Sequence, residues 1–364
     1  MCPFVKKFAM ATLENSLIKS KFRGCLLGSL IGDCVGAPFE GDTVTSGDKI
    51  VIQRYFEKLQ DPSFKAPYKQ YTDDTAMMKS VAKFLIDKPE PDYKFLAKLF
   101  VNEYYNEPNR GYGQNVVEVF QKLKNTKYED VFKPAREQFF GGGSYGNGGA
   151  MRIAPVALYF HSNYDAMIEV AKNATKITHS NVLGINGALL QCVAIHQALL
   201  SDPENSIDPK TFCSELSTKM KDIEEVEEDN LDNINNVYHE KLKIIEQLLQ
   251  KEPDTEDLDE EVITKLGNGI RAHESVPTAI YCFLRAQNEI PVVETENSFR
   301  RTIQYAITLG GDTDTIACMA GALAGAYLGE DAINSTLTKH CEFNKEVLEI
   351  AENLYRAREG SPTN

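Results

Sequence analysis

The sequence predicts an all-α protein, folded as a single compact orthogonal multi-helix domain. Apolar residues recur at helical spacing along most of the chain, and the alternation typical of strands never lasts beyond a few residues. The chain has 364 residues, of which 42% are hydrophobic, enough for one large core. Within it we expect an N-terminal extension (1–18), a helical domain (19–358) and a C-terminal tail (359–364).

The first predicted helix, Leu17–Val35, carries a glycine at every fourth position: Gly24, Gly28, Gly32 and, just beyond, Gly36. Residues four apart share one face of a helix, where each glycine costs about 1 kcal/mol relative to alanine. Close approach of a neighbouring backbone or of a ligand best explains such a glycine ridge.

The same spacing returns in Ala317–Leu328, with Gly321, Gly325 and, just beyond, Gly329. We expect this segment to pack against the first helix in the centre of the fold. Helical spacing predicts further helices, in chain order, over Ala76–Ile86, Tyr93–Tyr105, Ala166–Ile177, Val182–Leu200, Val237–Leu249, Val276–Ala286, Phe299–Leu309 and Phe343–Ala357.

Residues 202–265 are predicted to be an acidic elaboration of this domain. They begin with Asp202-Pro203, and acids cluster between 222 and 232 and again between 252 and 261. Such clusters form either a regulatory or partner surface or, more commonly, a solvated helix face with a loop.

Charge and cysteine usage narrow the class of protein. A net charge of −14 argues against a broad basic surface that binds nucleic acid phosphates. Backbone N–H groups or metal ions could still form a local anion site. The eight cysteines include no Cys-x-x-Cys pair, which predicts reduced thiols in an intracellular protein. No apolar run reaches the roughly 18 residues of a membrane span, and neither a secretory signal nor the Arg and Ser enrichment of a mitochondrial leader is evident.

Two acidic motifs each stand directly before a predicted helix. The first, Tyr71–Thr75, holds Asp73 and Asp74, which could simply cap the helix, a role that Asp and Thr favour. In the second, Gly310–Thr315, one cap does not explain acids at both 312 and 314. Its flanks are mostly apolar and hold no Lys or Arg, so carboxylates buried there need another counter-charge.

A third acid, Glu40, follows the first glycine helix; alone, it would pass for a surface glutamate. Together the three segments offer an all-oxygen ligand set without His or Cys, which suits Mg²⁺ or Mn²⁺ before Zn²⁺. One Mg²⁺ usually takes only one or two carboxylates, so two ions sharing a bridging Asp account for the excess charge. The candidate ligands are Glu40, Thr72, Asp73, Asp74, Asp312, Asp314 and Thr315.

The segment Gly141–Arg152 is rich in glycine. Its successive N–H groups could form a nest for phosphate oxygens, completed by a helix that begins near Ala150. A floppy linker is the alternative, against which the tyrosine inside it and the apolar continuation argue. The rings of Phe139, Phe140 and Tyr145 could stack on a nucleobase or pack in the core.

These motifs together, Gly32–Glu40, Tyr71–Thr75, Gly143–Arg152 and Gly311–Thr315, resemble the ADP-ribosylglycohydrolase family over about residues 20–355. The resemblance implies an all-α fold shared with the dinitrogenase reductase-activating glycohydrolases. It implies two Mg²⁺ ions, for which Mn²⁺ can substitute, on the seven ligands named above, with Glu40 on a mobile loop over the metals.

The resemblance also implies a set of substrate-binding residues. Residues 143–146 would hold the diphosphate, and Phe139 and Tyr145 would frame the adenosine. His179, which follows an apolar helix, is by itself more often structural. The implied set is Asp73, Phe139, Gly143, Ser144, Tyr145, Gly146, Asn147, His179 and Ile270.

The motifs match best the vertebrate branch of the family that removes serine-linked ADP-ribose and degrades poly(ADP-ribose). The implied catalytic residues are Glu40, Asp312 and Asp314. Glycoside cleavage passes through an oxocarbenium-like state. We expect one of the two aspartates to orient the attacking water, and Glu40 either to protonate the leaving oxygen or to gate the site.

We therefore expect ADP-ribosylated proteins and poly(ADP-ribose) as partners and ADP-ribose as product, and we expect no sequence-specific nucleic acid, no membrane, and a monomer. The resemblance implies a role after DNA damage in the nucleus and cytoplasm, with a mitochondrial pool as a further location. The alternatives are arginine-linked ADP-ribose as substrate, Mg²⁺-dependent hydrolysis of the diphosphate, and a non-catalytic reader of ADP-ribose.

Overall fold

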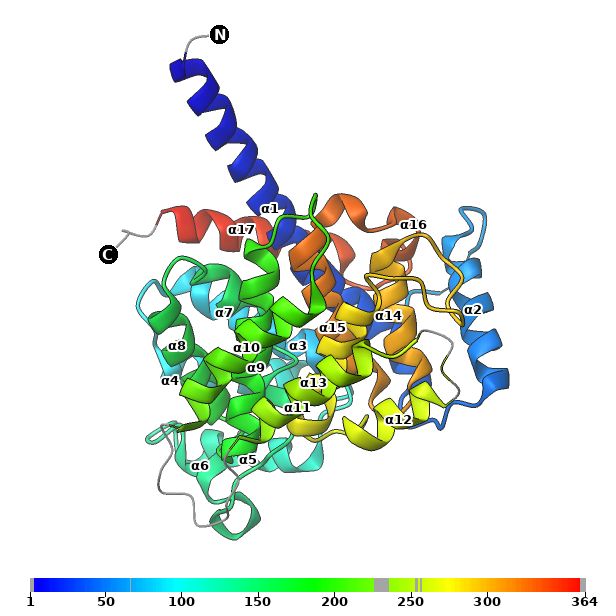
Figure 1. Cartoon of the computed structure of the whole chain (residues 1–364). Helices are drawn as coiled ribbons and strands as arrows, with labels where there is room; N and C mark the ends of the chain where they lie inside the picture. Colours follow the sequence, from blue (N-terminus) through cyan, green and yellow to red (C-terminus); the bar gives the residue numbers. More distant parts are fainter. Residues whose placement is uncertain (1–2, 66, 226–235, 253–254, 256, 361–364) are drawn as a thin grey trace.

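The computed structural model describes residues 3–65, 67–225, 236–252, 255 and 257–360, with side chains from residue 15 onward. These residues form helices and loops and no strand, so the predicted all-α single domain is confirmed (Figure 1). The α-helices are α1 (Pro3–Gly36), α2 (Ser46–Gln60), α3 (Asp73–Asp87), α4 (Tyr93–Asn106), α5 (Gln114–Asn125), α6 (Lys133–Arg136), α7 (Ala154–Tyr159), α8 (Tyr164–Lys176), α9 (Val182–Leu200), α10 (Pro209–Glu225), α11 (Val237–Leu249), α12 (Leu258–Lys265), α13 (Ala272–Arg285), α14 (Ser298–Thr308), α15 (Thr313–Leu328), α16 (Ser335–Thr338) and α17 (Asn344–Glu359). Short 3₁₀ turns span Ala37–Phe39, Gln138–Gly141, Asn147–Gly149 and Glu330–Ala332.

The glycine ridge joins α1 to α15 in the middle of the molecule (Figure 1). A Cβ atom added to Gly32 would lie 2.0 Å from the carbonyl oxygen of Ala317, so no side chain fits there. The backbones of the two helices therefore touch, which confirms the predicted packing. At the end of this contact the Thr313 hydroxyl donates to the Gly36 carbonyl oxygen at 3.0 Å, which sets the first turn of α15 beside the last turn of α1.

The ten helices predicted from helical spacing are present, and α9 and α11 begin and end at the predicted residues. The longer helices α2, α5, α10 and α12 are absent from the prediction. One of them carries a readable signal, because Thr45 and Asp48 form a capping box at the start of α2. The helix expected to begin near Ala150 begins four residues later: α7 starts at Ala154 and has six residues, and Pro155 lies in its first turn, where proline fits a helix.

The acidic elaboration, residues 202–265, packs onto the domain through α10 and α11, although the acids of 226–235 lie outside the described residues. Glu224 is buried near the end of α10. Its carboxylate accepts the backbone N–H groups of Tyr238 and His239 at the start of α11, at 2.9 and 3.1 Å. One acid of the first cluster therefore caps a helix rather than facing solvent.

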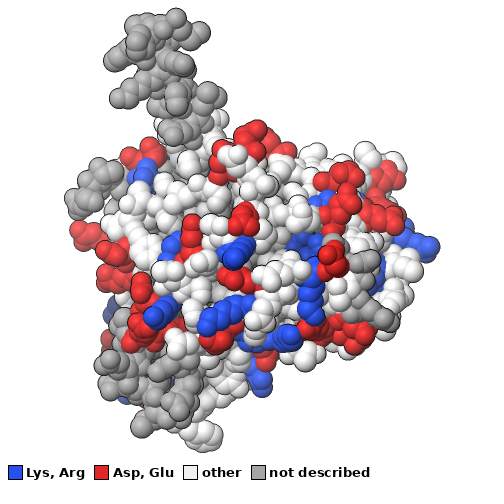
Figure 2. Space-filling model, viewed as in Figure 1, with Lys and Arg blue, Asp and Glu red and all other residues white. Residues whose placement is uncertain are grey.

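Helix α9 has the length and composition of a membrane span. The sequence prediction did not identify it as such, because its apolar residues are interrupted by polar ones. However, 89% of its apolar window is buried inside the protein, the environment of a core helix. The seven described cysteines are free and buried, in line with the prediction of reduced thiols. On the face shown in Figure 2, basic and acidic side chains of the described residues are interspersed, so that face offers no broad basic field.

Candidate active site

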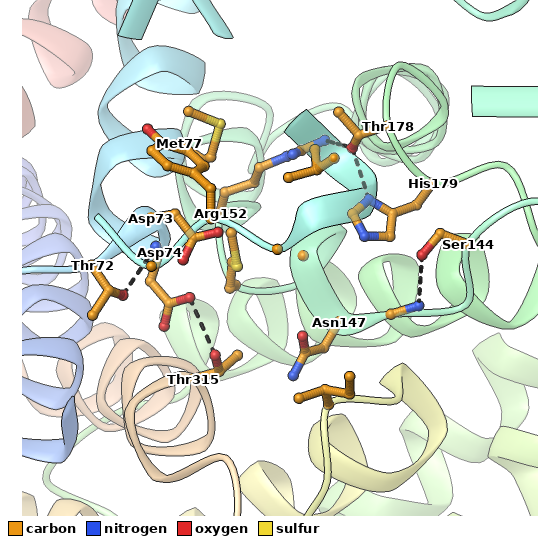
Figure 3. A pocket seen from close by; sticks show the side chains of 18 of the residues that line it. Thr72, Asp73, Asp74, Met77, Ser144, Asn147, Arg152, Thr178, His179 and Thr315 are labelled. Atoms are coloured by element: carbon orange, nitrogen blue, oxygen red, sulfur yellow. Dashed lines mark hydrogen bonds between the residues drawn. The ribbon is translucent and has the colours of Figure 1, made fainter. Parts of the chain in front are cut away.

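One cavity of about 280 Å³ gathers most of the predicted site residues. They come from the starts of α3 and α15, the loop after α1, the glycine-rich loop, the turn between α8 and α9, and the segment before α13. In Figure 3, Asp74 points toward Thr315, while Asn147 and His179 face the same space from other segments. The predicted residues that line the cavity are Glu40, Thr72, Asp73, Asp74, Ser144, Gly146, Asn147, His179, Ile270, Asp312, Asp314 and Thr315.

The start of α3 presents its two acids to this cavity. Thr72 is the N-cap, and its hydroxyl accepts the N–H of Asp74 at 3.3 Å, so capping does not occupy the carboxylates of Asp73 and Asp74. Asp33, fully buried in α1, supports the turn from behind. Its carboxylate accepts the N–H of Thr72 at 3.0 Å and the N–H and hydroxyl of Thr75 at 3.1 and 2.5 Å.

The start of α15 presents its acids in the same direction. Asp312 occupies the N-cap position but makes no capping hydrogen bond, and its Oδ2 instead accepts from Asn147 Nδ2 at 2.5 Å. Thr315, the third residue of the helix, donates its N–H to Asp314 Oδ1 at 2.9 Å and its hydroxyl to Asp74 Oδ1 at 3.2 Å. Helix capping therefore does not account for either acidic motif.

The carboxylates crowd into two groups that share Asp314. Oxygens of Asp33, Asp74 and Asp314 lie within 4.8 Å of one another, and so do those of Glu40, Asp312 and Asp314. Burial, followed by the charges of Asp312 and Glu40, raises the pKa of Asp314 to about 9. Burial and the charge of Asp314 likewise hold the pKa of Asp74 well above its usual range. Without added positive charge, this cluster therefore retains protons near neutral pH.

The same residues fit divalent cations. Asp74 Oδ2 is buried and has no hydrogen-bond partner within the described part of the chain, which leaves its lone pairs free for a metal ion. The surrounding donors are carboxylate and hydroxyl oxygens, the ligands that hard cations prefer. Asp33 is less suited as a ligand, because both of its oxygens already accept hydrogen bonds from the Thr72–Thr75 turn.

The loop that carries Glu40 is tied to the start of α15. The N–H of Gly41 donates to the Gly311 carbonyl oxygen at 2.8 Å, and the N–H of Gly311 donates to the Asp42 carbonyl oxygen at 3.1 Å. Gly311 has φ +75°, and a Cβ atom on it would lie 2.2 Å from the Asn268 carbonyl oxygen. Only glycine fits this junction, which holds the exposed Glu40 against the buried acids of α15.

The glycine-rich loop is packed, which excludes the linker interpretation. A Cβ atom on Gly148 would lie 2.7 Å from His179 Cε1, so the loop and the imidazole are in close contact. The loop is also tied to the segment before α13, because the N–H of Asn147 donates to the Ile270 carbonyl oxygen at 3.0 Å. Ser144 thereby borders the cavity on the side opposite Asp73 and Asp74 (Figure 3), and Gly146 lines the same cavity.

Three predicted substrate-binding residues do not line this cavity. Gly143 packs against Ser180 at the start of α9, while Phe139 and Tyr145 are 50% and 41% exposed and remain accessible for stacking. The neighbouring Phe140 is fully exposed, so its alternative role in the core is wrong.

Several functional candidates are missing from the prediction. Asp33 had a readable signal, an acid inside a small-residue helix beside the ridge, and Arg152 ends the glycine-rich motif without a predicted role. The rest of the wall comes from mainly apolar or neutral residues, which sequence patterns cannot tell from core. These additional lining residues are Met77, Gly111, Tyr112, Gly113, Asn115, Val116, Phe120, Gln138, Gly148, Met151, Arg152 and Thr178.

A family model described as ADP-ribosylglycohydrolase matches residues 14–364. The chain therefore belongs to the ADP-ribosylglycohydrolase family, and it is a hydrolase that acts on ADP-ribose glycosidic bonds. The fold and the acid-lined cavity described above agree with that class.

Particular relatives cover nearly the whole chain. ADP-ribosylhydrolase ARH3 of Homo sapiens is 44% identical over 349 residues, which are 93% of each chain. ADP-ribosylhydrolase ARH3 of Gallus gallus is 42% identical over 350 residues, 92% of this chain and 93% of that one. A solved structure titled "ADP-ribosylglycohydrolase-related protein complex" has a TM-score of 0.65 at 18% identity and covers 94% of this chain and 99% of its own, which supports the fold.

Proposed function

We propose that the protein hydrolyses the O-glycosidic bond at C1″ of ADP-ribose attached to serine in proteins, and the corresponding bonds of poly(ADP-ribose), and that it uses two Mg²⁺ ions. The main support for metal dependence is the buried Asp74 oxygen that has no partner inside a crowd of carboxylates. The identity of 44% with a protein named ADP-ribosylhydrolase ARH3, together with the Gly143–Arg152 motif, supports the substrate class.

The ligands of the two ions would be Glu40, Thr72, Asp73, Asp74, Asp312, Asp314 and Thr315. Bound Mg²⁺ would supply charge that neutralises the acids, holds ribose hydroxyls and makes water more acidic. The chain supplies the alignment: Asn147 fixes the carboxylate of Asp312, and Thr315 fixes that of Asp74.

The acid–base roles follow from exposure and environment. Asp312 and Asp314 lie on the cavity wall, where either carboxylate can accept the proton of the attacking water as its oxygen bonds to C1″. Glu40 lies at the exposed edge, and partial burial and the charge of Asp312 raise its pKa. A raised pKa suits Glu40 to protonate the serine oxygen as the C1″–O bond breaks.

The test uses a peptide that carries ADP-ribose on serine, with Mg²⁺, and identifies the product by chromatography. We expect free ADP-ribose, loss of activity with a chelator, and recovery with Mg²⁺ or Mn²⁺. Asp74→Asn should lower the rate by about 10²-fold or more, because a ligand and a charge are lost. Asp87→Asn, at the exposed end of the same helix, is the matched control and should keep the wild-type rate.

Other outcomes identify the alternatives. AMP as product would mean cleavage of the diphosphate, and tight ADP-ribose binding without turnover would mean a reader. Faster release from an arginine-linked peptide than from the serine-linked one would overturn the serine assignment while leaving the glycohydrolase class intact. Undiminished activity in the presence of the chelator would show that hydrolysis does not depend on a metal ion.

A further inference from the structure

Three buried polar side chains that line the cavity, Arg152, Thr178 and His179, are linked in a chain (Figure 3). Arg152 Nη2 donates to Thr178 Oγ1 at 2.7 Å and to the Ala174 carbonyl oxygen at 3.1 Å. Thr178 Oγ1 in turn lies 2.7 Å from His179 Nδ1. The guanidinium rests on the ring of Phe100, with its carbon 4.3 Å from the ring centre.

The direction of each hydrogen bond follows from the donor inventory. A guanidinium only donates, so Thr178 Oγ1 accepts from Arg152 and must place its own hydrogen elsewhere. Among the described residues, the acceptor within reach of that hydrogen is His179 Nδ1. Nδ1 must then carry a lone pair, and the single proton of a neutral imidazole lies on Nε2.

We propose that Thr178, held by Arg152, is a positioning residue that fixes His179 as the neutral Nε2–H tautomer, so that the imidazole presents a hydrogen-bond donor to a phosphate oxygen of the bound diphosphate. The opposite tautomer would leave the Thr178 hydrogen buried without an acceptor, at a cost of about 1–3 kcal/mol. Burial and the positive charge of Arg152 lower the pKa of His179 to about 3, so the ring stays neutral at working pH.

The space in front of Nε2 suits an anionic oxygen. The Cβ position of Gly146 lies 3.4 Å from both His179 Nε2 and Ser144 Oγ, so the two groups face a common point that glycine leaves open. Ser144 Oγ already accepts the N–H of Gly146 at 3.3 Å, which frees its hydrogen to donate outward. Two donors at one point match a phosphate oxygen. This ligand role rests on the function proposed above, whereas the tautomer does not.

The test compares Thr178→Val, which removes the hydroxyl at nearly constant shape, with Thr178→Ser, which restores it. Thr175→Val is the matched control, because its buried hydroxyl donates to the Ala171 carbonyl oxygen within α8, at 2.8 Å, and not to His179. Nitrogen-15 NMR of histidine-labelled, metal-free protein reports the tautomer, and His179→Gln assigns the signal. Calorimetry with ADP-ribose and steady-state kinetics report the ligand role.

We expect Nε2–H in the wild type, Thr178→Ser and Thr175→Val, and a mixture of tautomers in Thr178→Val. The ADP-ribose dissociation constant and KM should rise about tenfold in Thr178→Val, with kcat within about twofold, because a binding contact is weakened equally before and during reaction. An Nδ1–H or protonated His179 in the wild type at pH 7 overturns the proposal whatever the enzyme hydrolyses. Unchanged ADP-ribose affinity in a Thr178→Val protein with mixed tautomers overturns the donor role. If Thr178→Val does not fold, the wild-type and Thr178→Ser spectra still decide the tautomer.

Discussion

The glycine ridge can be tested by placing one methyl group between α1 and α15. In Gly32→Ala the new Cβ would lie 2.0 Å from the Ala317 carbonyl oxygen, whereas real Cβ contacts stay beyond 3.0 Å. The two backbones must therefore separate by about 1 Å, along a helix pair with no flexible side chain to absorb the shift. Overpacking of this kind costs about 3 kcal/mol.

The same separation should reach the cavity, because Asp33 adjoins Gly32 and supports the turn that carries the α3 acids. We expect Mg²⁺ affinity to fall by at least about tenfold, as is usual when support for metal ligands is disturbed. Urea unfolding in chelator measures the stability, and calorimetric Mg²⁺ titration measures the affinity.

Gly47→Ala is the matched control, because this helical glycine in α2 has only Thr45 Oγ1, at 3.7 Å, near its Cβ position. It should leave Mg²⁺ affinity unchanged and stabilise the protein by roughly 0.5 kcal/mol. Wild-type stability in Gly32→Ala would refute the close packing. Lower stability with unchanged Mg²⁺ affinity would refute the link between the ridge and the site.

Three further predictions concern charge. Burial and like charges raise the pKa of Asp73 to about 7 and that of Asp314 to about 9, from 3.8. The contribution of these acids to the stability of the metal-free protein should therefore be highest below pH 4 and should be lost as the pH rises towards 9. The Mg²⁺-induced rise in Tm should therefore be larger at pH 8 than at pH 5, and an equal or smaller rise contradicts this. Glu40→Gln should lower the rate of ADP-ribose release by about 10²-fold with Tm unchanged, because the side chain is exposed; a wild-type rate excludes its role as the acid. Glu224→Ala should destabilise the protein by about 1–3 kcal/mol in urea unfolding, with kcat unchanged, because the N–H groups at the start of α11 lose their acceptor. Asp222→Ala, at an exposed position on the same helix, should have little effect. Equal losses of stability in the two variants would argue against the capping role of Glu224.

Much of the fold could be predicted because helical spacing and the glycine ridge are local patterns. The missed helices show the limit of that approach. The start of α2 is readable from the Thr45–Asp48 capping box, which apolar spacing does not consider. The start of α7 is instead set by Pro155, which fits in the first turn of a helix. The acidic stretch was ambiguous for a different reason. Whether an acid such as Glu224 faces solvent or caps a distant helix depends on packing that no run of charges encodes.

The sequence by itself determined the chemical character of the site, because the acids of Gly310–Thr315 have no basic neighbour in the chain and require a counter-charge once they are buried. It also predicted the central helix pair, since glycine at every fourth position of two helices indicates close approach of a backbone or a ligand, and the structure shows that each ridge faces the other backbone. Only the tertiary structure decided which acid supports the turn before α3 and which acid faces the cavity. Asp33 and Asp74 have the same side chain, but the oxygens of Asp33 accept four hydrogen bonds from three donor groups, while Oδ2 of Asp74 has no partner among the described residues. Hydrogen-bond partners come from segments distant in the chain, and so does the Arg152–Thr178–His179 arrangement that fixes a proton on one nitrogen.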